Sequence, residues 1–223
     1  MRIIFVRHAH PNYAKDCLTE IGHKQAAAVA KRLKEEGIEK IYSSSKRRAV
    51  ETAEYTAREF SLNIEQCDFA REISWGSKNG EALYMNGHPW KTMDDMVAKG
   101  QSILNLNWMD REPFCNNTVS DHVKRVTQST DAWLSTLGYE REGDFYRVGK
   151  DTDKTVAMFS HGGSSGAMLA HMFNLPFLFV GTSIRPEFTG ITIVTFSNET
   201  GTLVAPKFEL VNDTSHLQDL TNK

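Results

Sequence analysis

The sequence has few cysteines and prolines, and it has no long apolar run. Cys17, Cys67 and Cys115 are the three cysteines among 223 residues. Three is an odd number and too few for a disulfide scaffold, so they are typical of reduced thiols in a cytoplasmic protein. The first apolar run, Ile3 to Val6, is too short for a signal peptide or a membrane-spanning helix. We therefore expect a cytoplasmic protein without disulfides or a membrane partner.

The sequence also lacks an excess of charge of one sign. Lys and Arg number 26, Asp and Glu number 28, and the formal net charge is −2. No block of Lys and Arg marks a nucleic-acid or membrane surface, so neither is an expected partner. An anionic substrate would need a local positive pocket. The eight histidines show no HExxH-type spacing, and we predict no metal and no cofactor.

Strand-type and helix-type patterns alternate from the first residue, which predicts a three-layer α/β/α sandwich with a mostly parallel central sheet. No linker or internal repeat interrupts residues 1–223, so we expect a single domain. The first expected elements are a strand at Arg2–Val6, a helix that opens at Leu18-Thr19 and is capped by Gly37, a strand at Ile38–Tyr42, a turn at Ser43–Ser45, and a helix with Ala49, Thr52, Ala53, Ala57 and Phe60 on its inner face.

The middle of the chain has no clean period. Residues 77–117 contain scattered aromatics and methionines, and we interpret this region as an insertion that either fills the core or forms a lid. The later expected elements are a helix from about Thr118, a hairpin turn at Gly143-Asp144, a strand at Thr155–Phe159, a helix through Ala167 to Phe173, and strands at Ile191–Phe196 and Leu203–Leu210 joined as a hairpin.

Two expected strands end in histidine, at Val6-Arg7-His8 and at Phe159-Ser160-His161-Gly162. A third junction places Arg48 in the first turn of the following helix. In an open α/β sheet, ligands bind at the carboxyl ends of the strands. Two arginines, two histidines and helix N-termini that converge there suit a phosphoryl group, because guanidinium forks and free N–H groups match its oxygens.

Taken together, these residues resemble the histidine phosphatase superfamily, which includes the cofactor-dependent phosphoglycerate mutases. Five stretches carry the resemblance, in the family's order and over most of the chain. They are Arg7-His8-Ala9; Leu18-Thr19-Glu20-Ile21-Gly22-His23-Lys24-Gln25-Ala26; Ser44 through Arg48-Ala49 to Thr52-Ala53; Arg71-Glu72 to Gly76; and Ser160-His161-Gly162.

The resemblance implies a phosphoglycerate mutase-like fold and a metal-independent, histidine acid phosphatase-type phosphatase that acts on a small phosphorylated metabolite. It implies that His8 is the nucleophile, with a backbone carbonyl fixing its other ring nitrogen. Arg7, Arg48, His161 and Gly162 would bind the phosphoryl group, and Glu72 would protonate the leaving oxygen. A homodimer is a further expectation that stays open.

Several alternatives stay open at this point. The family commonly has Gly and then an acidic residue after the catalytic histidine, where this chain has Ala9 and His10. No Asn stands at the position that the mutase branch favours, since the loop reads Asn12-Tyr13-Ala14. These departures favour a phosphatase over a mutase that would use the same phosphohistidine. His10 is either a substrate contact or an exposed loop residue.

Two weaker hypotheses depend on other residues. Gly162-Gly163-Ser164-Ser165-Gly166 matches G-x-S-x-G, so a serine esterase with Ser164, Asp213 and His216 is formally available. Asp213 and His216 could equally reach the mouth of the site or belong to a polar tail. Glu72 could pair with Arg71 instead of serving as an acid. A non-catalytic phosphoryl-binding module is the remaining alternative.

Overall fold

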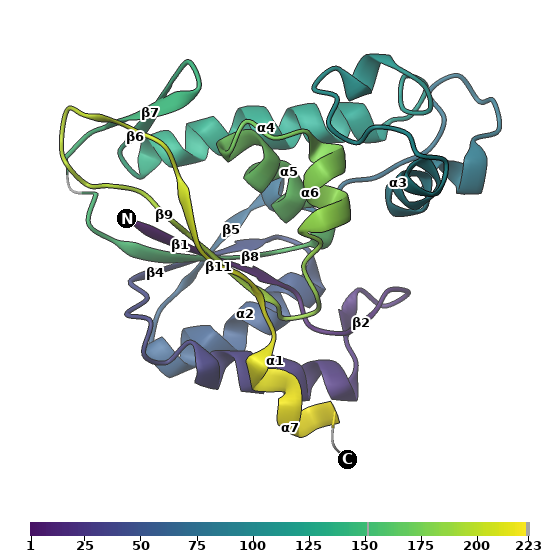
Figure 1. Ribbon diagram of the computed structural model, residues 1–223. Helices are drawn as coiled ribbons and strands as arrows, with labels where there is room; N and C mark the ends of the chain where they lie inside the picture. Colours follow the sequence, from purple (N-terminus) through teal and green to yellow (C-terminus); the bar gives the residue numbers. More distant parts are fainter. Residues whose placement is uncertain (151, 222–223) are drawn as a thin grey trace.

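A computed structural model describes residues 1–150 and 152–221. Its centre is a six-stranded sheet in the order β11-β9-β1-β8-β4-β5 (Figure 1). The strands are β1 (Arg2–Arg7), β4 (Lys40–Ser44), β5 (Ile64–Cys67), β8 (Thr155–Ser160), β9 (Ile191–Thr195) and β11 (Lys207–Asp213). The four strands β1, β8, β4 and β5 are parallel to one another, while β9 runs antiparallel to β1 and β11 antiparallel to β9.

Helices cover both faces of this sheet (Figure 1). On one face lie α1 (Glu20–Arg32) and α2 (Arg47–Phe60), with α7 (Gln218–Thr221) beside α1. On the other lie α4 (Val119–Thr136), α5 (Gly162–Met172) and α6 (Phe177–Ser183). Ile4 and Val6 pack in the core under α1 and α2, whereas Ile3 and Phe5 pack in the core under α4 and α5. A strand that is apolar on both faces thus holds two helical layers, which confirms the predicted three-layer α/β/α sandwich.

Some element boundaries predicted from the sequence are wrong. The first helix ends at Arg32 with Leu33 as its cap, so Gly37 lies beyond the helix, with a φ of +67°. Ser43 and Ser44 are the last residues of β4 and not part of a turn. Arg7 and Ser160 likewise belong to β1 and β8.

The predicted hairpin between the last strands is also corrected. The predicted strand Leu203–Leu210 is divided into two strands. β10 (Leu203–Val204) pairs with β7 (Phe145–Val148) outside the central sheet, and β11 pairs with β9. β7 forms the expected hairpin with β6 (Tyr139–Glu142) across Gly143-Asp144. A short ribbon of β2 (Pro11–Asn12) and β3 (Cys17–Leu18), which the sequence did not indicate, follows His8.

The middle region contains only short helices: η2 (Tyr84–Gly87), α3 (Pro89–Ala98) and η3 (Trp108–Asp110). Its large apolar side chains Met93, Met96, Trp108 and Phe114 belong to the core that includes α4, α5 and α6. These side chains of the middle region are therefore part of the hydrophobic core. A lid role for the rest stays a prediction.

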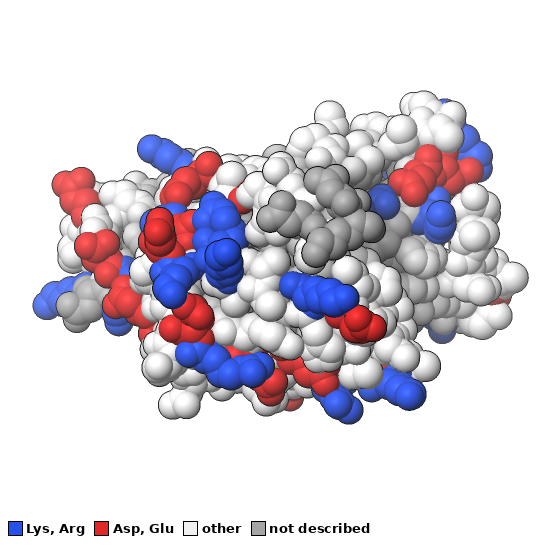
Figure 2. Space-filling model, turned by 90° about the horizontal axis from the view of Figure 1, so that it is seen from below, with Lys and Arg blue, Asp and Glu red and all other residues white. Residues whose placement is uncertain are grey.

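The charged surface agrees with the balanced composition. Figure 2, which views the molecule from the side of α1 and α2, shows Lys and Arg interspersed with Asp and Glu. Ion pairs such as Arg2 with Glu36 and Lys34 with Glu59 contribute to this mixture. Within residues 1–150 and 152–221, no helix has both the length and the apolar character needed to cross a bilayer.

Candidate active site

The parallel register of β1 and β8 brings two histidines together. Arg7 lies opposite Ser160 in this register, so the next residue of each strand, His8 and His161, leaves the same edge of the sheet. The His8 N–H donates to Ser160 O at 2.9 Å, and the two imidazole centroids are 5.0 Å apart. Both side chains are buried, with 1% and 0% of their surface exposed. The expected meeting of the two strand ends is therefore observed.

The surroundings of His8 fix its ring as a neutral imidazole. Nδ1 lies 2.8 Å from Ala9 O and donates its proton there, so Nε2 keeps its lone pair. Burial, followed by the charges of Arg48 and Arg7, lowers the pKa of His8 to about 3, against the hydrogen bond to Ala9. In this structure the Nε2 lone pair accepts a hydrogen bond of 3.2 Å from Nε of Arg48.

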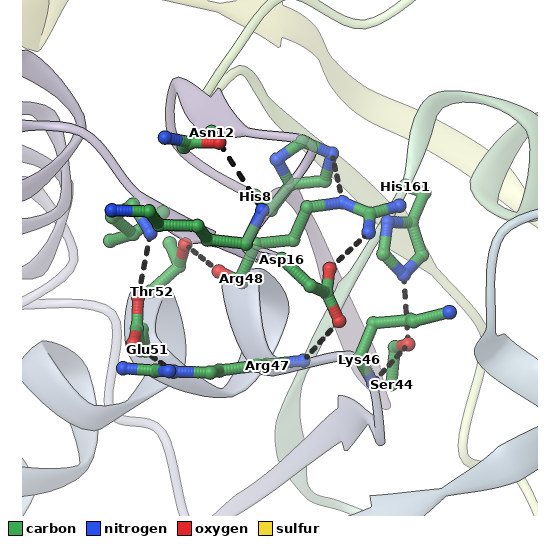
Figure 3. A network of polar contacts seen from close by, with 12 residues as sticks. His8, Asn12, Asp16, Ser44, Lys46, Arg47, Arg48, Glu51, Thr52 and His161 are labelled. Atoms are coloured by element: carbon green, nitrogen blue, oxygen red, sulfur yellow. Dashed lines mark hydrogen bonds and ion pairs between the residues drawn. The ribbon is translucent and has the colours of Figure 1, made fainter.

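Arg48 reaches the site from the first turn of α2 and is held by a carboxylate that sequence reasoning missed. Its side chain is 8% exposed, and Nη1 forms an ion pair with Asp16 (Figure 3). Asp16 has a left-handed backbone, with a φ of +50°, and its other oxygen accepts from the N–H of Arg47 at 3.2 Å. No local pattern signals this contact, because it depends on how the loop after His8 turns back toward α2.

Arg7 is the last residue of β1, and one buried N–H of its guanidinium group has no hydrogen-bond partner among the described residues. Its Nη1 donates to Pro186 O at 2.8 Å, and its guanidinium carbon lies 4.1 Å from the centroid of Phe188. Its Nε is buried and has no hydrogen-bond partner among the described residues. A buried donor without a partner is costly, so an anion bound at this point would gain a ready hydrogen bond. The loop with Pro186 and Phe188 was not anticipated from the sequence.

Glu72 is held by the first turn of α5. Its Oε1 accepts from the N–H groups of Ile73 at 3.0 Å, Gly163 at 3.0 Å and Ser164 at 3.2 Å. A Cβ on Gly163 would lie 2.6 Å from that oxygen, so only glycine permits this approach. Burial raises the pKa of Glu72, although the Ile73 amide and the two site arginines oppose the shift. The partners of this carboxylate are backbone amides, and the alternative pairing with Arg71 is wrong.

His161 caps the N-terminus of α5 and contacts the end of β4. Its Nε2 shares a hydrogen bond of 2.8 Å with Ser44 Oγ, another contact that the sequence did not reveal (Figure 3). Burial, followed by the charges of His8, Arg48 and Arg7, lowers the pKa of His161 well below its usual value. Gly162 follows it as the first residue of the helix. His8 thus contacts both Arg48 and His161, while Arg7 and Glu72 line one cavity beside them.

A cavity of about 600 Å³ opens beside this cluster. Its walls are mainly arginine and aromatic side chains, with two carboxylates. They are Arg7, Tyr13, Glu72, Trp75, His88, Trp90, Gly162, Arg185 and Glu187. The rings of Trp75 and His88 are in contact, tilted by 45° with centroids 4.5 Å apart, and His88 and Trp90 show that the middle region supplies part of the wall.

The serine esterase geometry is not assembled. Ser164 Oγ accepts from the backbone N–H of His161 at 3.3 Å, and its residue is fully buried. Asp213 pairs with Arg32 at 3.2 Å, and His216 Nε2 shares a hydrogen bond of 3.0 Å with Thr189 Oγ1. The three candidate triad residues therefore have other partners, and Asp213 links β11 to α1.

The loop residues after His8 make contacts of their own. His10 is exposed, and its Nδ1 shares a hydrogen bond of 2.9 Å with Thr19 Oγ1, the N-cap of α1. Its ring also lies edge-on to Phe188 at 5.3 Å. The side chain of Asn12 accepts from the N–H of Lys15 at 3.2 Å, so this amide braces its own loop.

A buried neutral histidine, two arginines and a carboxylate thus lie at the carboxyl edge of the parallel strands of an α/β fold. The family model of the histidine phosphatase superfamily (branch 1) matches residues 3–208, and the chain belongs to this family. Comparison with curated protein sequences finds no match.

Solved structures of phosphatases share the fold. Phosphoserine phosphatase from Entamoeba histolytica, in complex with 3-phosphoglyceric acid, is 20% identical with a TM-score of 0.66, covering 97% of this chain and 98% of that chain. A mycobacterial glucosyl-3-phosphoglycerate phosphatase is 19% identical with a TM-score of 0.65, covering 96% and 99%. The α-ribazole phosphatase from Shigella flexneri is 15% identical with a TM-score of 0.62, covering 96% of each chain.

Proposed function

We propose that the protein is a metal-independent phosphomonoester hydrolase that acts on a small phosphorylated metabolite through a phosphohistidine at His8. The observation that carries the proposal is the state of His8, a buried neutral imidazole whose Nε2 lone pair faces Arg48 beside His161. The names of the structural relatives, which are phosphatases of small phosphorylated compounds, support the substrate class.

In the first step, Nε2 of His8 attacks phosphorus and the bond from phosphorus to the ester oxygen breaks. Arg48 Nε, which now donates to Nε2, exchanges this acceptor for a phosphoryl oxygen and so frees the nucleophile. The unused Nε of Arg7 donates to the same group. These positive charges stabilise the negative charge that spreads over the phosphoryl oxygens in the transition state.

Glu72 serves as the proton donor in this proposal. Its raised pKa keeps a larger share of the carboxyl group protonated, and the proton passes to the leaving oxygen. In the second step the carboxylate takes a proton from water, whose oxygen attacks the phosphorus of phospho-His8. Phosphate leaves, and His8 returns to the neutral state from which it began.

A phosphoglycerate mutase would use the same first step and then return the phosphoryl group to a phosphoglycerate. The loop after His8 favours water as the acceptor, since the Asn12 side chain is engaged with the N–H of Lys15. Incubation with 3-phosphoglycerate and catalytic 2,3-bisphosphoglycerate, followed by phosphorus NMR, distinguishes the two. We expect inorganic phosphate, and fast formation of 2-phosphoglycerate with little phosphate would establish the mutase.

The direct test is to trap the intermediate during hydrolysis of p-nitrophenyl phosphate in EDTA. We expect a phosphoenzyme that is stable to alkali and labile to acid, as a phosphoramidate is. His8→Ala should lose both the adduct and turnover, and His23→Ala, which removes an exposed histidine of α1, should keep both. An alkali-labile adduct, or turnover that survives in His8→Ala, contradicts the proposal. Binding of the ester without any turnover would identify a non-catalytic module.

A further inference from the structure

A second cavity, of about 580 Å³, shares Glu72 with the first. It lies between η1 (Asp68–Ala70) and α4, and the proposed mechanism does not use its other residues. Three strong cations line it: Lys46 from the N-cap of α2, Arg71 from the end of η1 and Arg125 from α4. Hydroxyl groups of Ser74 and Ser129 line it as well.

These three cations line one cavity without a carboxylate partner in the described part of the chain. Lys46, Arg71 and Arg125 form no ion pair with any residue that the structure describes, whereas Arg2 and Arg32 each pair with two carboxylates. Among the described residues, Arg125 donates only to main-chain carbonyls, Phe69 O at 3.0 Å and Asp68 O at 3.5 Å. Their positive charge is therefore not neutralised by direct contact.

The two acidic residues of the cavity are engaged with other groups. The Asp68 carboxylate accepts from Ser45 Oγ, and Glu72 Oε1 accepts the three backbone N–H groups described above. Burial, followed by the charge of Arg71, lowers the pKa of Arg125, and the charge of Asp68 opposes this shift without reversing it. Burial and the charge of Arg125 lower the pKa of His122, the remaining titratable residue of the wall. Like charges that line one cavity raise the free energy of the folded protein, and a bound anion would lower it.

We propose that this cavity binds a second anionic group of the substrate, a carboxylate or a phosphate carried by the part of the ester that leaves. The inference rests on the proposed function, because Glu72 lines both cavities and would protonate the leaving oxygen. In the first cavity the cation other than Arg7 is Arg185, and it is already paired with Asp94 at 3.0 Å. The unpaired cations thus point to the second cavity as the place where an anionic leaving group is recognised.

The experiment compares ω-phosphonooxy carboxylates of two to six carbons with their amides, which differ only in charge at the far end. We measure kcat/KM for each pair with the wild type, Arg71→Gln and Arg125→Gln. The control is Lys124→Gln, which removes the same charge from an exposed neighbouring position of α4. For the chain length that fits, the wild type should prefer the carboxylate by at least about tenfold, as expected for a charge-assisted hydrogen bond.

The preference should fall about tenfold in Arg125→Gln and in Arg71→Gln, and it should persist in Lys124→Gln. No preference at any chain length, or an equal loss in the control, overturns the proposal. A separate bound anion is the other source of the same chemistry. Free succinate would then change turnover of p-nitrophenyl phosphate without competing with it, and the carboxylate preference would be absent.

Failure of the proposed function gives a different result. If no ester of the series is hydrolysed, calorimetry on the wild type with the corresponding phosphonates measures the same carboxylate-to-amide ratio as a ratio of Kd values. A tenfold ratio that Arg125→Gln removes supports the second site without any catalysis, and equal Kd values overturn it.

Discussion

The two sides of the candidate active site are built in different ways. On one side lie His8 and His161, which follow β1 and β8, and Arg48 from α2. They are at most 7% exposed and contact one another and the side chains of Ser44 and Asp16. The opposite wall comes from Trp75, His88 and Trp90, and Trp75 is 39% exposed. The first side derives from strand register, and the second from a few contacts between loops.

This difference separates the determinants of chemistry from those of substrate choice. Register fixes His8 beside His161 through hydrogen bonds along two whole strands, so a single surface change cannot move them. The aromatic wall depends on the contacts between the two ends of the middle region, near Gly76 and Asn117, which we call the neck. There Thr118 N–H donates to Gly76 O at 2.8 Å, and the side chain of Asn117 bonds to the main chain of Gly76 and Gly87. We expect mutations at the sheet edge to change kcat and mutations at the neck to change KM.

After the loss of turnover expected for His8→Ala, the largest effect should come from Glu72→Gln, which keeps the nucleophile and the phosphate-binding groups but removes the proton donor. We expect a loss of about 10²–10⁴ in rate for alkyl phosphates, the usual contribution of general acid–base catalysis. The loss should be much smaller for p-nitrophenyl phosphate, whose leaving group hardly needs a proton. Steady-state kinetics with both substrates measures this, with the exposed Glu81→Gln as control. An equal loss for both classes would assign the acid to another carboxylate, such as Glu187, which lines the same cavity.

An intermediate effect concerns the pH dependence of stability. The pKa of His8 is 6.5 in the unfolded chain and about 3 in the folded protein. Between these two pH values the unfolded chain therefore binds one proton more than the folded protein does. Stability from neutral His8 is therefore present above pH 6.5 and is lost as the pH falls toward 3. Between pH 7 and pH 5 this loss is about 2 kcal/mol.

Urea unfolding of the wild type and of His8→Gln at both pH values checks this sign. The variant should lose about 2 kcal/mol less than the wild type on acidification, because it lacks the titrating group. His23→Gln, which removes an exposed histidine, should follow the wild type. Parallel losses in all three proteins would show that His8 is not held neutral by burial.

The sequence predicted the sheet edge far better than the opposite wall. Two apolar strands that each end in histidine are enough to predict their meeting, because parallel strands expose their carboxyl ends at one edge. Asp16 and Ser44 were missed since their contacts join segments 32 and 117 residues apart. Met93 and Trp108 are buried through packing of short helices, so no period revealed them as core.

The element boundaries failed for a related reason. Gly37 has the left-handed backbone of a helix cap, yet an extra turn separates it from Arg32, the end of α1. The pairing of β10 with β7 depends on the position of the β6–β7 hairpin, which is far away in sequence. Local patterns predicted which segments are strands, and only the assembled fold determines which strands pair.

The smallest expected effect, and the one that tests the comparison most directly, is that of Asn117→Ala. Asn117 is 1% exposed; its Nδ2 donates to Gly87 O at 2.7 Å, and its Oδ1 accepts from the N–H groups of Gly76 at 3.3 Å and Val119 at 3.0 Å. It therefore ties Trp75, next to Gly76, and His88, next to Gly87, to the start of α4. Truncation leaves these main-chain groups without partners, and we expect a stability loss of about 1–3 kcal/mol.

The consequence for function should appear in KM. With the wall loosened, KM for a substrate with a large leaving group should rise about tenfold, equivalent to roughly 1.4 kcal/mol of binding, while kcat changes little. Asn116→Ala is the matched control, because in the described part of the chain that side-chain amide bonds only to Ser77 and Asn79. Thermal unfolding of both variants shows whether they are folded at the assay temperature. A fall in kcat at constant KM would mean that the neck positions the reacting groups themselves, and the division between the two sides of the cavity would be wrong.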